Sequence, residues 1–338
     1  MRCVIHEKVP GLDGLTLADR PIPVPGPGEV LLEIRAAALN HRDIWTCLGR
    51  DLDKPAAILG SDGAGVIAGR GPGVEDIDEG AEVVVNPTLD WPDERSGPPR
   101  GGYDGLLIGY PTDGTLAEYA VVPRANVEPK PAHLSWEQAA AVPLVGITTY
   151  RALFTEGELQ SGQMVVIPGI GAGTSIMALQ LAKAAGARVV VTSRSPEKGE
   201  RARALGADLA LASDAEWAPA VRKLTGGAGA DLVIESVGAP TWNQSVACLR
   251  QGGRLVVFGA TAGDIVEIDL AYVFLHWISI RGTTMGNTAE CRAMLEMVNQ
   301  HQIEPVIDRM FPLSEGVDAI RHLDAGTHFG KVVVRPER

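Results

Sequence analysis

The stretch from Met164 to Lys198 constrains the fold of this chain more than any other. It opens with a short apolar run, Met164 to Ile167, which has the length of a buried parallel strand. A glycine-rich turn follows, and then apolar residues recur at helical spacing until Gly186 ends the helix. A second apolar run leads to Ser193 and Arg194. This order of strand, glycine turn, helix and strand predicts a right-handed βαβ unit.

The glycines of the turn indicate a dinucleotide-binding site. Gly169 and Gly171 fit the pattern G-x-G and Gly173 follows, whereas Thr174 stands where the usual fingerprint has its third glycine. A pyrophosphate must approach the backbone N–H groups at the start of the helix, and a β-carbon would block that approach. A glycine-rich turn without a ligand is the alternative, but the flanking strand and helix favour a dinucleotide.

The end of the second strand predicts NADPH rather than NADH. Enzymes that use NAD place an acidic residue about 20 positions after the glycines, where it binds the ribose hydroxyls. Here Ser193 and Arg194 occupy that place, and the first acidic residue is Glu197. A carboxylate would repel a 2′-phosphate, whereas serine and arginine can donate hydrogen bonds to it. The alternative for Arg194 is an ordinary solvated arginine at a strand end.

The composition narrows the class of protein. With 338 residues the chain has room for about two domains, and 45% hydrophobic residues suffice for a core. A net charge of −12 argues against nucleic acid or an anionic membrane surface as a partner. No apolar run reaches the roughly 18 residues of a membrane span, and the N-terminus lacks a signal-peptide core, so a cytoplasmic protein is expected.

Two kinds of organisation follow one another along the chain. Residues 1–85 contain short strand-like runs, which predict a β-rich domain. Residues 86–114 are rich in proline, glycine and charge, which predicts a surface lobe with Trp91 and Tyr103 as candidate anchors. Strands then alternate with helices through about residue 282, which predicts an α/β fold with a doubly wound parallel sheet.

Several further motifs occur in the order found in one known superfamily. They are PGPGEVLLEIRAAALNHRD, LGSDGAGVI, AAAVPLVGITTYRAL, GGRLVVFGAT and FGKVVV. Through them the chain resembles the medium-chain dehydrogenase/reductase superfamily, in particular its zinc-free, quinone oxidoreductase-like branch. The resemblance implies a GroES-like β-rich catalytic domain of residues 1–145 and 284–338. It also implies a Rossmann domain of residues 146–283 and an active site in the cleft between the two.

The chain departs from the zinc enzymes of that superfamily at the metal sites. The places of their catalytic zinc ligands hold Asn40, Ser61 and Leu144, and the segment that would bind a structural zinc contains no cysteine. Amides and hydroxyls are poor zinc ligands and a leucine is none, so we expect no zinc. Without a Lewis acid, hydride addition to an activated C=C is easier than carbonyl reduction, because the enolate charge is delocalised.

The resemblance also implies which residues form the site. The catalytic candidates are Asn40, His41, Trp45 and Asp62. Each also has a structural interpretation, as a turn asparagine, a surface histidine, a packed tryptophan or a hydrogen-bond organiser. The expected cofactor contacts are Thr148, Gly169, Gly171, Gly173, Ser193, Arg194, Lys198, Gly238, Gly259, Met285 and Lys331. Lys331 is expected to face the pyrophosphate, and an ordinary ion pair is its alternative.

Together these features predict an NADPH-dependent, zinc-free oxidoreductase that transfers hydride to the activated C=C of a quinone or an α,β-unsaturated carbonyl compound. One alternative is a metal-free alcohol or aldehyde dehydrogenase that acts on C=O, and another is an NADPH-binding protein without turnover. The resemblance implies a homodimer or homotetramer. The segment from His276 to Arg281 is expected to form an edge strand that pairs across a two-fold axis.

Overall fold

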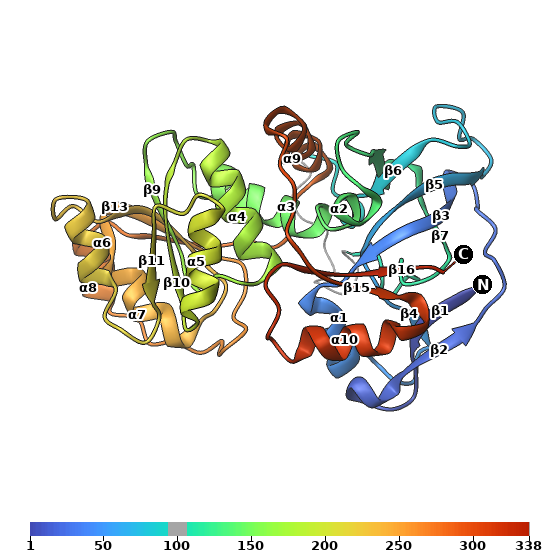
Figure 1. The fold of residues 1–338 in the computed structure, drawn as a ribbon, viewed down its shortest axis with the longest axis horizontal. Coiled ribbons are helices and arrows are strands. Elements are labelled where there is room, and N and C mark those ends of the chain that lie inside the picture. The colour runs from blue at the N-terminus through green and yellow to red at the C-terminus, as the bar shows by residue number, and fades with distance from the viewer. Residues whose placement is uncertain (94–106, 338) are drawn as a thin grey trace. The chain divides into compact units, whose positions relative to one another are not determined.

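The structure, a computed structural model, describes residues 1–93 and 107–337. Tyr103 and the middle of the predicted surface lobe lie outside these residues, whereas Trp91 is described and is buried. The chain forms two compact units, residues 1–145 with 287–338, and residues 146–286. The first unit contains both ends of the chain, drawn blue and red in Figure 1.

The first unit is built on a mostly antiparallel sheet. Its strands follow the order β15 (Ile307–Pro312), β16 (Lys331–Arg335), β3 (Glu29–Ala38), β5 (Asp62–Arg70), β6 (Glu82–Val85) and β8 (Val127–Pro129), and β7 (Tyr119–Pro123) also pairs with β3. A small second sheet consists of β2 (Leu15–Asp19), β1 (Arg2–His6) and β4 (Ala57–Ile58). The described helices include α1 (His41–Gly49), α2 (Trp136–Ala140), α9 (Thr288–His301) and α10 (Gly316–Asp324). The predicted β-rich domain is confirmed.

Strand β3 shows how the sequence builds this unit. Its residues alternate between buried and half-buried positions, with Val30, Leu32 and Ile34 turned into the apolar core. A period of two is what a strand with one face on the core requires. Strand β3 lies between β5 and β16. The residues that follow its last residue, Ala38, therefore lie next to both of these strands.

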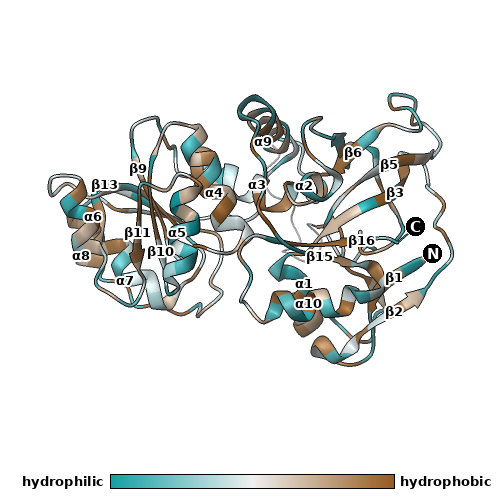
Figure 2. Cartoon of the chain, in the orientation of Figure 1, coloured by the Kyte–Doolittle hydropathy of each residue, from teal (hydrophilic) through white to brown (hydrophobic). Residues whose placement is uncertain are grey.

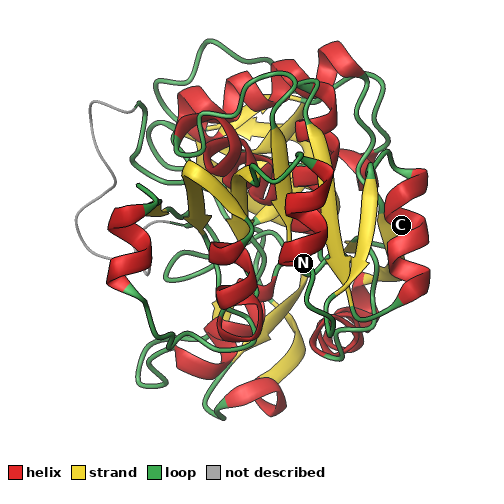
Figure 3. Ribbon diagram, turned by 90° about the vertical axis from the view of Figure 1, so that its left-hand side faces the viewer, coloured by secondary structure: helices red, strands yellow, loops and turns green. Residues whose placement is uncertain are grey.

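The second unit is a six-stranded parallel sheet with helical connections (Figures 1 and 3). The strand order is β11 (Leu209–Ala212), β10 (Arg188–Ser193), β9 (Met164–Ile167), β12 (Ala230–Glu235), β13 (Leu249–Val257) and β14 (Ser279–Gly282). The helices are α4 (Gly173–Ala184), α5 (Pro196–Ala204), α6 (Ala218–Leu224), α7 (Ala239–Ala247) and α8 (Leu270–Leu275). All neighbouring strands are parallel, so the predicted doubly wound α/β sheet is confirmed.

The sheet of the second unit changes its direction of growth between β9 and β12. Strands β10 and β11 follow on one side of β9, and β12, β13 and β14 follow on the other. Open α/β sheets bind their ligands at the carboxyl ends of the strands at such a switch point. Gly169 follows β9 and Gly238 follows β12, so two of the predicted cofactor glycines lie at this point.

The edge strand expected at residues 276–281 is observed as β14, at the end of the sheet. It begins later than expected, at Ser279, and Trp277 has a φ of +54°, outside the β region of regular strands. Helix α8 occupies the residues just before it.

Apolar residues gather inside each unit. The core of the second unit includes Val166, Val190 and Val233 from three neighbouring strands, and two of these strands, β9 and β10, are largely brown in Figure 2. Among the helices of residues 1–93 and 107–337, none is long and apolar enough to cross a membrane.

Candidate active site and cofactor site

Sheet register brings Asn40, Asp62 and Lys331 together. Ala38 at the end of β3 lies opposite Asp62 of β5 and opposite Val333 of β16. Both pairings are antiparallel, so Asn40, two residues beyond Ala38, approaches Lys331, two residues before Val333. The three residues are 5%, 0% and 4% exposed, respectively.

The ammonium group of Lys331 is held by Asn40 and Asp62. Its Nζ donates to Oδ1 of Asn40 at 2.6 Å and to Oδ2 of Asp62 at 3.0 Å. Nδ2 of Asn40 donates to the same Asp62 oxygen at 2.9 Å, and the backbone N–H of Leu144 donates to the other oxygen at 2.8 Å. Both ends of the Asn40 amide are therefore used inside the cluster. The ion pair is the alternative interpretation given above for Lys331, and its contact with a pyrophosphate stays a prediction.

The residues at the expected zinc position do not fit a zinc ion. Oδ1 of Asn40 and Oδ2 of Asp62 already accept from an ammonium group, Oδ1 of Asp62 accepts from the backbone N–H of Leu144, and the side chain of Leu144 has no ligand atom. The hydroxyl of Ser61 donates to the carbonyl of Ile108 at 2.6 Å and accepts from Nη1 of Arg42 at 2.6 Å. Zinc prefers thiolate and imidazole ligands. Among the described residues, no group of three His, Cys, Asp or Glu side chains could hold a metal ion.

Asp43 supports this cluster from the first turn of α1. Its Oδ2 accepts a hydrogen bond from the backbone N–H of Asn40 at 2.8 Å, which fixes the start of the helix. Burial raises the pKa of Asp43, against the opposing effects of Arg42, the Asn40 N–H group and Lys331. The carboxylate of Asp43 thus interacts electrostatically with Asp62 and Lys331, and all three groups are buried.

Helix α1 carries the other two catalytic candidates on its exposed side. The rings of His41 and Trp45 meet edge to face with centroids 5.3 Å apart, and Trp45 is 43% exposed. Neither joins the buried cluster, although Asn40 directly precedes His41. Desolvation lowers the pKa of His41, although nearby Asp324 acts in the opposite direction.

The glycine turn of the second unit leaves the first turn of α4 open to an anion. Gly169 and Gly171 have φ values of +70° and +143°. The residue before α4 is Ala172, which offers no side-chain cap, whereas α2, α5 and α9 each begin with a capping Ser or Asn. A Cβ on Gly171 would lie 3.3 Å from Nζ of Lys198. Uncapped N–H groups, a backbone without side chains and a neighbouring ammonium group fit a phosphate.

The residues predicted to select NADPH lie at the carboxyl end of β10. Ser193 is the last residue of the strand, and its hydroxyl accepts from the backbone N–H of Ser195 at 3.0 Å. Arg194 is exposed, and its guanidinium forms no ion pair with any described residue. The next acidic residue, Glu197, is an exposed residue of α5.

The predicted cofactor residues include two further pairs, and the members of each pair lie close together or on neighbouring strands. The hydroxyl of Thr148 lies 3.5 Å from Sδ of Met285, and both residues are buried. Gly238 and Gly259 follow the neighbouring strands β12 and β13. A Cβ on Gly238 would overlap the carbonyl oxygen of Gly263, so only glycine fits there.

Sequence reasoning missed Glu235, which shapes the turn at the switch point. Its fully buried carboxylate accepts from the backbone N–H groups of Val237 at 2.7 Å and Gly238 at 3.1 Å. It also accepts from the hydroxyls of Thr241 at 2.9 Å and Ser245 at 2.6 Å. In the sequence, this role is indicated only by a glutamate at the end of an apolar strand. Its four hydrogen-bond donors belong to the following turn and helix and form no recognisable motif with it.

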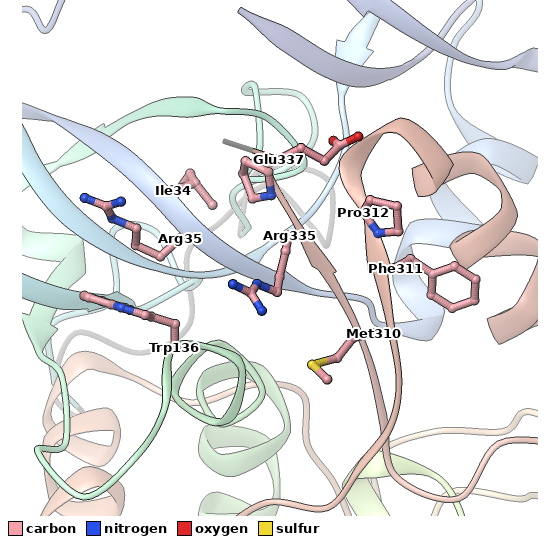
Figure 4. A pocket seen from close by; sticks show the side chains of 9 residues that line it. Ile34, Arg35, Trp136, Met310, Phe311, Pro312, Arg335 and Glu337 are labelled. Atoms are coloured by element: carbon pink, nitrogen blue, oxygen red, sulfur yellow. The ribbon is translucent and has the colours of Figure 1, made fainter.

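A cavity of about 660 Å³ lies elsewhere in the first unit (Figure 4). Its walls include Trp136 and two arginines, Arg35 and Arg335. Arg335 pairs with Glu137 at 2.9 Å and Arg35 with Glu33 at 3.3 Å, so both charges already have partners. None of the predicted site residues lines this cavity.

Comparisons with known proteins agree with this architecture. Residues 26–132 match the alcohol dehydrogenase GroES-like domain, and residues 173–300 match the zinc-binding dehydrogenase family. A zinc-type alcohol dehydrogenase-like protein of Schizosaccharomyces pombe is 34% identical, over 99% of both chains. The solved structure of an NAD-dependent alcohol dehydrogenase is 38% identical with a TM-score of 0.93, over 100% of both chains.

A third relative is the 2-octenoyl-CoA carboxylase reductase CinF, solved in complex with NADP and 2-octenoyl-CoA. It is 28% identical with a TM-score of 0.87, over 99% of this chain and 87% of its own. The predicted GroES-like and Rossmann architecture is thereby confirmed. The chain belongs to the medium-chain dehydrogenase/reductase superfamily of oxidoreductases.

Proposed function

We propose that the protein is an NADPH-dependent, zinc-free reductase that transfers hydride to an activated C=C of a quinone or an α,β-unsaturated carbonyl compound. The observation that carries the proposal is the ammonium of Lys331 bound to Asn40 and Asp62, where a zinc enzyme would hold its metal. In the zinc enzymes the metal acts as a Lewis acid at the carbonyl oxygen, and a direct carbonyl reduction here would lack that stabilisation. A conjugated C=C spreads the developing charge over several atoms, so hydrogen-bond donors can stabilise it.

The cofactor site supports NADPH, which supplies the hydride when it is bound. The open first turn of α4 and Lys198 suit the pyrophosphate, and Ser193 and Arg194 suit a 2′-phosphate. CinF was solved with NADP, whereas another relative is described as NAD-dependent. The residues of this chain favour NADPH, because the end of β10 has an arginine and no carboxylate.

The catalytic candidates divide into two roles. His41 and Trp45 are exposed on α1 and can meet a substrate, where the imidazole can relay a proton to the α-carbon or the oxygen of the enolate that hydride transfer to the β-carbon leaves. Asn40 and Asp62 are buried and fully engaged, so they act by holding α1 and Lys331 in place. Thr148 and Met285 are proposed to position the nicotinamide ring.

The test is NADPH oxidation with an enone that carries both a C=C and a C=O, followed by identification of the product. A saturated ketone supports the proposal. An allylic alcohol contradicts it and favours an alcohol dehydrogenase, the activity that the names of two relatives print. NADPH that binds tightly but is not consumed with any quinone, enone or aldehyde would indicate a binding protein.

We also propose that the protein forms a homodimer through the edge of the second unit's sheet. Among the described residues, β14 pairs with a strand on one side only, and α8 just before it exposes large apolar side chains. Leu270, Phe274, Leu275 and Trp277 are between 63% and 73% exposed. An open strand edge beside an exposed apolar patch is typical of an interface between two copies.

A further inference from the structure

A lysine and an aspartate buried as completely as Lys331 and Asp62 require a structural explanation. Burying an ammonium group is costly unless each charge is paired and hydrogen-bonded. Here the ammonium has one carboxylate and one amide oxygen as partners, at 3.0 Å and 2.6 Å. Both oxygens of Asp62 are also satisfied, by Leu144 on one side and by Asn40 and Lys331 on the other. The carboxylate of Asp62 and the amide of Asn40 are thus fully hydrogen-bonded, and the ammonium donates to two oxygens.

The cluster joins segments that are far apart in the chain. Lys331 begins β16, Asn40 lies between β3 and α1, Asp62 begins β5, and Leu144 lies in α3 (Pro143–Tyr150). Lys331 is 291 residues from Asn40 and 269 residues from Asp62. Connecting distant segments through oxygen ligands around one central cation is the structural work that a bound metal ion does in other proteins.

We propose that Lys331 is a built-in cation that takes the structural and electrostatic place of a metal ion at this site. The ammonium neutralises Asp62, fixes which way the Asn40 amide points and ties β16 to β3 and β5. It also excludes a divalent ion, because a second cation would have to share the same two oxygens at close range. The chain therefore keeps its site folded without any metal.

Neighbouring groups support this assignment. Asp43 of α1 and the thiol of Cys291 on α9 both interact electrostatically with Asp62. Burial raises the pKa of both groups, and the negative charge of Asp62 raises them further. Lys331 opposes the rise for Asp43, and it is the only cation that donates a hydrogen bond to Asp62 among the described residues.

The experiment compares unfolding in urea for the wild type and the variants Lys331→Met, Lys331→Arg, Asp62→Asn and Lys331→Met/Asp62→Asn. Removing one partner of a buried ion pair should lower the ratio of folded to unfolded protein roughly 150- to 5,000-fold. The double variant should be at least roughly tenfold more stable than Lys331→Met alone, because it leaves no unpaired charge. Lys331→Arg should recover part of the loss, since it restores the charge.

A matched control is Lys130→Met in the same unit. The side chain of Lys130 is 7% exposed and pairs at 3.3 Å with Glu82, which is 57% exposed. Its loss therefore leaves a carboxylate in water instead of a buried one, and less than roughly a sixfold change is expected. Metal content is measured by mass spectrometry on the wild-type protein purified from cells grown with added zinc. Dialysis of this protein against a chelator should leave its unfolding midpoint in urea unchanged.

One zinc ion per chain that survives purification overturns the proposal. So does a Lys331→Met variant as stable as the wild type, or a double variant in which the two losses simply add. If Lys331→Met does not fold, recovery of folded protein in the double variant supports the proposal, and its equal failure overturns it. These readouts involve neither NADPH nor an acceptor, so they are independent of the enone assay.

Discussion

Replacing Arg194 by alanine should remove the preference for NADPH and leave the affinity for NADH unchanged. Arg194 follows β10, the strand whose carboxyl end borders the glycine turn, and it has no ion-pair partner among the described residues. A hydrogen bond to a charged phosphate contributes about 1.5 to 3 kcal/mol. Because Arg194 is exposed, we expect the lower end, which corresponds to roughly a tenfold weaker affinity for NADPH.

The assay titrates each variant with NADPH and with NADH and measures binding by the fluorescence of the bound nicotinamide. Arg188→Ala is the matched control, because Arg188 is an exposed arginine at the opposite end of the same strand. The difference between the two cofactors should shrink at high salt, as expected for an exposed charge. A wild type that binds NADH as tightly as NADPH would refute the reasoning, as would an Arg194→Ala variant that loses affinity for both cofactors equally.

A carboxylate at the end of β10 should have the reverse effect. In Ser193→Asp the new carboxylate can accept the same N–H of Ser195 that the serine hydroxyl accepts now, so the turn is preserved. The carboxylate would repel a 2′-phosphate and bind the ribose hydroxyls of NADH. We expect the ratio of kcat/KM values to move toward NADH by tenfold or more, on the scale of one charged contact.

Two other predictions concern stability and assembly. His6 is fully buried: its Nδ1 accepts from Nε of Arg50 at 2.7 Å, so its Nε2–H donates to the carbonyl of Gly11 at 2.9 Å. Burial, assisted by Arg50, lowers the pKa of His6 from 6.5. The contribution of neutral His6 to the free energy of unfolding is therefore complete above pH 6.5. Below pH 6.5 the free energy of unfolding decreases by at most about 1.4 kcal/mol per pH unit. Urea unfolding from pH 5 to 8 should show this slope, and a His6→Gln variant with the same slope would contradict it. Phe274→Asp should convert a dimer into a monomer in light scattering, whereas Val24→Asp, at another exposed apolar residue, should not; a monomeric wild type would contradict the interface.

The second unit could be predicted from sequence because its signals are local. The run from Met164 to Ile167 is a strand with the same bounds in the structure, and the helix after the glycine turn ends just before Gly186. Each strand, turn and helix of a βαβ unit carries its own pattern within a few residues. The handedness and the parallel order then follow from general rules. The match of pattern and structure is therefore closest here.

The buried cluster of the first unit could not be predicted in this way. The positions of Asn40 and Asp62 were selected from a family resemblance, but their bonds to Lys331 depend on the register of three strands. Two residues 269 positions apart carry no common local pattern. For the same reason the four donors around Glu235 were not foreseen. Side-chain partners across a sheet or across a turn belong to the folded chain and have no counterpart in a single sequence.

The position of Lys331 so late in the chain has a consequence for biosynthesis. Asp62 leaves the ribosome 269 residues before the lysine that neutralises it, which is roughly 13 to 54 seconds at 5 to 20 residues per second. Throughout that time the nascent first unit has a carboxylate that it cannot bury. The second unit is continuous and can fold while it waits. Synthesis of β16 therefore supplies the cation that the first unit needs before it can bury Asp62.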